Sequence, residues 1–108
     1  MDNVQTHERI CTELNELYAA KNKDYGDSFH ESYVDYGLVM AAIRLGDKYN
    51  RMKTLVKAKD AAYKGESIRD TLIDLANYAI MTVMELDREV TQNEDHQTDE
   101  KPEESGDR

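Results

Sequence analysis

The sequence contains one cysteine, one proline, one phenylalanine and no tryptophan among 108 residues. One cysteine cannot form an internal disulfide, and no cysteine or histidine cluster has zinc-ligand spacing. No run of about 18 apolar residues occurs, so no membrane span is expected. No charged-then-apolar leader opens the chain, which favours a cytoplasmic protein. The net charge of −9 argues against nonspecific binding to duplex DNA, because basic residues supply most of that affinity.

The acidic residues are unevenly distributed along the chain. Residues 91–108 hold no large apolar side chain and carry seven acidic and two basic residues, which is five of the nine net negative charges. Such a segment cannot bury enough apolar surface to offset its loss of conformational entropy. We therefore expect a mildly acidic folded domain over residues 1–90 and a disordered acidic tail over residues 91–108.

Three segments have the apolar periodicity of helices. They cover about residues 3–20, about residues 31–59 (beginning at Glu31 or Asp35) and about residues 66–90. Proline is absent from all three, and so are β-branched runs with a period of two, which makes strands unlikely to form. The sequence predicts an all-α domain of three main helices, with the two longer helices packed antiparallel across a loop over Asp60–Gly65.

Each of the two longer segments carries an apolar stripe that is expected to form the core. The stripe of the second segment is Leu38, Ala42, Leu45, Tyr49, Met52 and Val56, and that of the third is Ile68, Leu72, Leu75, Ala79, Val83, Leu86 and Val90. Three helices in about 90 residues bury little surface, so we expect a homo-oligomer. Ile73, Ile80 and Met84 lie off the main stripe, and in a monomer they would be exposed apolar surface.

The third helical segment also carries a ridge of carboxylates. Glu66, Asp70 and Asp74 are spaced one turn apart, and Asn77 lies close to the same face. Like charges at this spacing repel by about a few tenths of a kcal/mol. We therefore expect a basic side chain or a metal ion to face this ridge.

The second helical segment carries the complementary pattern. Arg44, Asp47 and Arg51 share a face, and Lys48 flanks it; arginine suits bidentate binding of phosphate or carboxylate. In one interpretation both ridges are solvated surfaces, and Ser67 caps the third helix. In the other, the ridges meet in a cleft where carboxylates hold Mg²⁺ and the basic residues hold phosphates.

The segment between the first two helices, residues 21–30 (KNKDYGDSFH), favours the second interpretation. Gly26 permits a turn that other residues resist. Lysine side chains and backbone amides can hold phosphate, and Tyr25 or Phe29 can stack on a base. By contrast, Cys11 lies near Ile10 and Leu14, which predicts a buried and inert thiol.

Three blocks together resemble a known family. They are residues 23–29 (KDYGDSF), residues 43–48 (IRLGDK) followed by Arg51, and residues 66–79 (ESIRDTLIDLANYA). In this order they are similar to the nucleotide modification associated domain of the first type, which is found in phages and Firmicutes. The resemblance covers about residues 10–88. It implies a phage-type protein linked to nucleotides, in the host cytoplasm if phage-encoded, and it implies no particular reaction.

A more distant similarity is to the MazG-like all-α NTP pyrophosphohydrolases, which hold Mg²⁺ between facing helices. Residues 66–70 (ESIRD) look like the later acidic motif of that group, while its earlier paired-Glu motif is missing. This similarity implies Mg²⁺-dependent hydrolysis of a nucleoside triphosphate to monophosphate and pyrophosphate. The implied roles are as follows: Asp47, Glu66, Asp70 and Asp74 hold the metal and orient water, Lys23, Arg44, Lys48 and Arg51 hold phosphates, and Asp24, Tyr25 and Asn77 contact the ligand.

Two alternatives remain open at this point. The missing paired-Glu motif favours a module that sequesters or senses a nucleotide, or another small phosphorylated ligand, without hydrolysing it. The chain is otherwise a structural or regulatory phage protein whose two ridges pair with each other in an oligomer.

Overall fold

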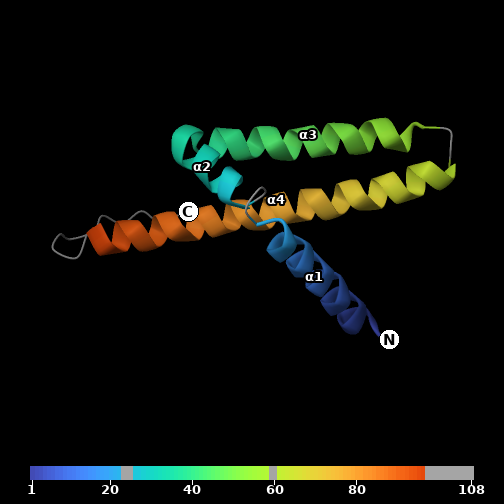
Figure 1. The fold of residues 1–108 in the computed structure, drawn as a ribbon, viewed down its shortest axis with the longest axis horizontal. Helices are drawn as coiled ribbons and strands as arrows, with labels where there is room; N and C mark the ends of the chain where they lie inside the picture. Colours follow the sequence, from blue (N-terminus) through green and yellow to red (C-terminus); the bar gives the residue numbers. More distant parts are fainter. Residues whose placement is uncertain (23–25, 59–60, 97–108) are drawn as a thin grey trace.

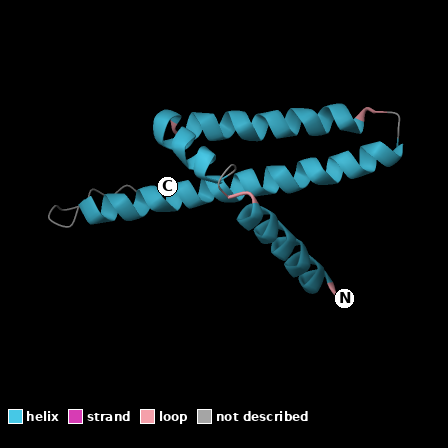
Figure 2. Cartoon of the chain, viewed as in Figure 1, coloured by secondary structure: helices cyan, strands magenta, loops and turns pink. Residues whose placement is uncertain are grey.

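The computed structural model describes residues 1–22, 26–58 and 61–96 (Figure 1). The helices are α1 (Asn3–Ala20), α2 (Gly26–Tyr36), α3 (Leu38–Val56) and α4 (Ala61–His96). No strand occurs in the described ranges, where the cartoon in Figure 2 shows only helices and short loops, which confirms the all-α fold class. The helices α3 and α4 run antiparallel side by side, as predicted, and α1 crosses the middle of α4 obliquely.

The first helix has the predicted bounds because its first turn is capped. The Gln5 backbone N–H donates to Asp2 Oδ1 at 2.8 Å, and the Asp2 backbone N–H donates to Gln5 Oε1 at 2.9 Å. This reciprocal pair satisfies two amides that a helix leaves free. Leu14 is buried against the rest of the fold, whereas Cys11 is exposed, so the prediction of a buried thiol is wrong.

The predicted second helix is two helices separated at Gly37. This glycine has a φ of +78°, a left-handed conformation that costs other residues roughly 1–2 kcal/mol. The chain turns there, and the Gly37 N–H donates to the Tyr33 carbonyl at 2.7 Å. The preceding helix, α2, begins at Gly26, so Phe29 lies on a helix and not in a loop. Phe29 is 1% exposed and belongs to the core, which rules out the predicted stacking on a base.

The core lies where α2 meets the α3–α4 pair. It consists of Phe29, Tyr33, Met40, Ala41 and Met81, with Tyr18, Tyr78 and Met84 packed against it. The ring of Phe29 lies 6.5 Å from that of Tyr33 and 5.8 Å from that of Tyr78, centre to centre. These distances are typical of aromatic pairs that add to the stabilisation from burial.

The last helix is longer than predicted at both ends. It begins at Ala61, so the predicted loop over Asp60–Gly65 is mostly helical, and Ser67 lies inside the helix and does not cap it. It ends at His96 and therefore includes residues 91–96, which the composition assigns to the tail; residues 97–108 lie outside the described residues. No helix in the described part of the chain is both long and apolar enough to cross a membrane.

The predicted apolar stripes do not form the contact between α3 and α4. On α3, Leu38 is 52% and Tyr49 50% exposed, and on α4, Leu72 is 44% and Val83 54% exposed. The buried residues of α4 are instead Ser67, Thr71, Asn77, Met81, Thr82 and Glu85. The prediction that these stripes form the core of one chain was wrong, because the helices approach through the ridge that carries Asp74. An apolar stripe indicates a face that needs a cover and does not say which chain supplies it.

The residues expected to lie off the main stripe also differ in their exposure. Met84 packs against the core, and Ile73 is half-buried beside α1. Only Ile80 among the three remains exposed, at 46%.

Candidate functional site

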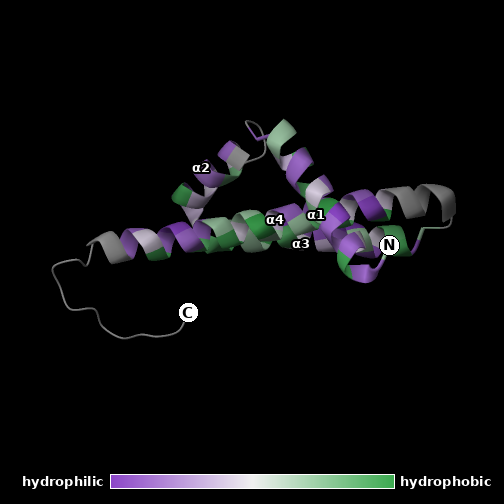
Figure 3. Ribbon diagram, turned by 90° about the horizontal axis from the view of Figure 1, so that it is seen from below, coloured by the Kyte–Doolittle hydropathy of each residue, from purple (hydrophilic) through white to green (hydrophobic). Residues whose placement is uncertain are grey.

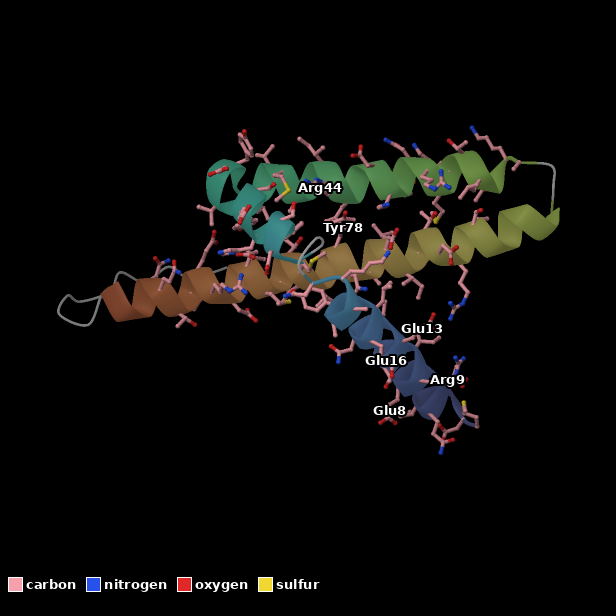
Figure 4. The ribbon with its side chains drawn as sticks, viewed as in Figure 1. Glu8, Arg9, Glu13, Glu16, Arg44 and Tyr78 are labelled. Carbon is pink, nitrogen blue, oxygen red and sulfur yellow. The ribbon has the colours of Figure 1, made fainter. Side chains whose placement is uncertain are left out.

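One ion pair joins Lys48, which flanks the basic ridge of α3, to Asp74 of the acidic ridge of α4. Lys48 Nζ lies 3.3 Å from Asp74 Oδ2 and 5.9 Å from the centre of the Tyr78 ring. Figure 4 places Arg44 and Tyr78 in the same region, where the two helices approach each other. The Lys48 and Asp74 side chains keep 27% and 35% of their surface exposed. A ligand can therefore reach this ion pair from solvent.

The first helix borders the same region from one side of the α3–α4 pair. Two hydrogen bonds of 2.8 and 2.7 Å run from the Arg69 guanidinium on α4 to the Glu13 carboxylate on α1. These bonds lower the pKa of Glu13 and raise that of Arg69. Further along α4, Asn77 Nδ2 donates to the Leu14 carbonyl at 3.3 Å. Together these contacts fix where α1 crosses α4.

Asn77 has a different role from the predicted one. Its side chain is 2% exposed, and its amide is bonded to the backbone of α1. A side chain this buried has no surface left for a ligand. We therefore assign Asn77 to holding α1 in place and not to contacting a base or sugar.

A hollow of about 400 Å³ lies between α1 and α4, next to the ion pair. It is lined by Glu13, Leu17, Lys21, Asp70, Ile73 and Asp74. Asp70 and Asp74 come from the predicted acidic ridge, and Asp74 also contacts Lys48. The structure thus brings together three predicted site residues. It adds Lys21, which follows the last residue of α1.

Of the remaining predicted site residues, those that the structure describes do not line this hollow. Arg44 is half-buried one turn before Lys48 on α3, and Asp47 and Arg51 are exposed on the same helix. Lys23, Asp24 and Tyr25 lie outside the described residues, and so does the side chain of Glu66. Their predicted roles stay predictions.

The predicted magnesium site also stays a prediction. Within residues 1–22, 26–58 and 61–96, no three carboxylate, histidine or cysteine side chains with described positions lie close enough together to hold a metal ion. Asp70 and Asp74 offer oxygen donors, which Mg²⁺ prefers. Asp74, however, already pairs with Lys48.

A second polar cluster was not anticipated from the sequence. The Glu85 carboxylate, with a side chain only 6% exposed, lies 2.9 Å from His30 Nδ1 and 2.6 Å from Arg88 Nη1. Since a carboxylate only accepts, His30 Nδ1–H and Arg88 are the donors. A cavity of about 290 Å³ adjoins the cluster. His30 is 55 residues away from Glu85, and only the spacing of Glu85 and Arg88, one helical turn apart, gives a sequence signal.

Comparison with known proteins gives one match. The family described as Nucleotide modification associated domain 1 matches residues 21–86. The match includes Lys21, Lys48, Asp70 and Asp74, and it leaves out all of α1. No curated protein and no solved structure matches the chain.

Proposed function

The chain belongs to the nucleotide modification associated domain 1 family, and on this basis we propose that it binds a nucleotide or a closely related small phosphorylated ligand. The proposed site is the hollow between α1 and α4 together with the Lys48–Asp74 pair. We propose in addition that the protein is cytoplasmic and self-associates.

The observation that carries this proposal is the Lys48–Asp74 contact beside a hollow of about 400 Å³. That volume falls within the roughly 300–1,000 Å³ of small-molecule sites. Lys48 and Lys21 supply positive charge at two points of the site, and Arg44 lies one turn from Lys48. In the proposed complex these groups bind phosphate, and Arg51 extends the basic surface along α3. Lys23, Asp24 and Tyr25 keep their predicted role as ligand contacts.

A substitution at Lys48 tests this assignment. Lys48→Met should weaken nucleotide binding by at least about 10-fold, because it removes a charge-assisted contact worth roughly 1.5–3 kcal/mol. It should change the stability of the fold by less than about 1 kcal/mol, since the ion pair is partly exposed. Lys57→Met is the matched control, because Lys57 is exposed just after α3. Equal affinities of both variants in calorimetry would refute the placement of the site.

A second candidate function is Mg²⁺-dependent hydrolysis of a nucleoside triphosphate to monophosphate and pyrophosphate. The observation that favours it is that Asp70 and Asp74 line the same hollow one turn apart. In this proposal they would hold the ion with Glu66, whose side chain lies outside the described residues, and Asp47 would have to approach them from α3 to join, because the three aspartates do not form a metal-binding group as they stand. The bound metal would activate water and neutralise phosphate charge. Asp70→Asn should then abolish pyrophosphate release while nucleotide still binds. If the unaltered protein releases no pyrophosphate from any of a panel of normal and modified nucleotides, the proposal reduces to binding alone.

A further inference from the structure

We propose that the uncovered apolar side of the α3–α4 pair is the contact surface for a second copy of this chain. This apolar face is defined by Leu38, Tyr49 and Val56 of α3 and by Leu72, Val83 and Leu86 of α4. All six residues are between 38% and 54% exposed in the single chain. The inference deepens the self-association in the proposed function and does not depend on nucleotide binding.

The two exposed stripes lie on the same side of the helix pair. At about 100° per residue, each stripe is offset by roughly 120° from the line of contact with the other helix, and in the same rotational sense. That line passes near Leu55 on α3 and near Glu85 on α4, which are both buried. Because the helices are antiparallel, equal offsets in the same sense point to the same side. The two stripes therefore form one continuous face.

The helix α2 and the C-terminal half of α1 lie on the opposite side. On α4, the residues that hold α1 are Asn77 and Arg69, which lie roughly 80° and roughly 160° from the contact line, respectively, in the other rotational sense. Figure 3 shows α2 and the C-terminal half of α1 on one side of the α3–α4 pair, while the N-terminal half of α1 crosses the pair toward its other side. A partner on the apolar face would therefore lie beside the N-terminal half of α1.

The apolar face is large for a chain of this size. Half-exposed large apolar side chains each leave on the order of 80–100 Å² accessible, so the six residues expose about 500 Å² per copy. The half-buried Leu45, Met52, Ile68 and Leu75 extend this face along both helices. The six residues alone fall in the upper part of the roughly 300–600 Å² of the largest patch on a typical monomer, and the added residues bring the face toward the roughly 800 Å² per partner of a standard interface.

The pattern of the face favours a second copy over a different partner. The apolar residues recur every three or four positions along both helices, which is the spacing by which helices pack side by side in bundles. Both stripes consist of uncharged residues, and the one cation placed over a ring of the face among the described residues is Lys53, whose Nζ lies 4.9 Å from the centre of the Tyr49 ring. A twofold rotation sets two such antiparallel pairs against each other as a four-helix bundle, with the same surface used by both copies. This arrangement also supplies the second layer that an amphipathic helix pair requires.

Light scattering on the full chain after size exclusion tests the proposal. The expected mass is twice the 12.5 kDa of the chain. Leu72→Glu and Val83→Glu should each raise the dissociation constant by at least about 100-fold, because each copy would bury an unpaired carboxylate. Val34→Glu is the control, since Val34 on α2 is 67% exposed and lies away from the face. A monomeric unaltered chain at all concentrations from about 1 to 100 μM would overturn the proposal.

Two further readouts separate loss of association from loss of folding. A dimer that keeps its affinity in both face variants would also overturn the proposal, because the interface would lie elsewhere. If a variant loses its helical circular dichroism signal, the test is made on the unaltered protein instead. The melting temperature of the unaltered protein should rise with protein concentration, and a melting temperature that stays constant would refute the dimer. A monomeric variant that still binds nucleotide would show that the two proposals stand separately.

Discussion

Replacing Asn77 by alanine is expected to loosen the contact between α1 and α4. The substitution removes the hydrogen bond of 3.3 Å to the Leu14 carbonyl and leaves a small void at a residue that is 2% exposed. Losing a buried hydrogen bond of this kind costs about 1–3 kcal/mol. Each kcal/mol lowers the melting temperature of a domain of this size by roughly 4–8 °C. Thermal unfolding followed by circular dichroism, at equal protein concentrations, measures the loss.

The matched control for this prediction is Asn50→Ala, because Asn50 is exposed on α3. Its melting temperature should differ from that of the parent by no more than a few degrees, as expected for a surface substitution. The reasoning is refuted if Asn77→Ala has the same melting temperature as the parent protein but no longer binds nucleotide. That outcome would return Asn77 to the ligand contact predicted from the sequence.

Three further predictions concern the turn between α2 and α3 and two shifted pKa values. Gly37→Ala should lower the free energy of unfolding by roughly 1–2 kcal/mol, because the φ of Gly37 is +78°. Gly46→Ala should raise it by about 0.5–1 kcal/mol, because Gly46 lies within α3 and an added Cβ there meets nothing within 4 Å. Denaturant titration measures both changes. Arg69 lowers the pKa of Glu13 from its ordinary 4.5, so the stability this pair contributes is present above that pH and lost as pH falls through the lower pKa; melting temperatures of the parent and Glu13→Gln should converge in acid, and a constant difference would contradict the pairing. Burial raises the pKa of Tyr33 above 10.0, so the stability that the neutral phenol gives the fold is present below pH 10 and is lost as the pH rises through the raised pKa. Absorbance titration should show one tyrosine that ionises later than the others, and Tyr33→Phe should remove it.

The helical elements were largely predictable because their signals are local. Apolar periodicity and the absence of proline located α1, α3 and α4, and α1 has the predicted bounds. The break at Gly37 was missed because periodicity does not report φ, and a single glycine within a helical pattern is often tolerated. The start of α2 was missed because Gly26 and the polar residues after it are typical of a loop, while the burial of Phe29 depends on contacts with α4.

The faces of the helices were harder to predict than the helices themselves. The residues of both ridges lie on α3 and α4, and one ion pair, between Lys48 beside the basic ridge and Asp74 of the acidic ridge, joins the two helices. The stripes were assigned to the interior because a sequence does not say whether its own chain covers an apolar face. Within the site, the spacing of charged residues along each helix was enough to select Lys48, Asp70 and Asp74 as candidates. The burial of Asn77 depends on the crossing angle of α1, which no local pattern encodes.

A titration of the isotope-labelled full chain with a nucleoside triphosphate, followed by the backbone and lysine resonances in NMR, tests the central claim most directly. The account predicts shifts concentrated at Lys21, Lys48, Asp70 and Asp74, with none at Val34 on α2. Shifts confined to the cluster of His30, Glu85 and Arg88, or no shifts at any nucleotide concentration, would contradict it.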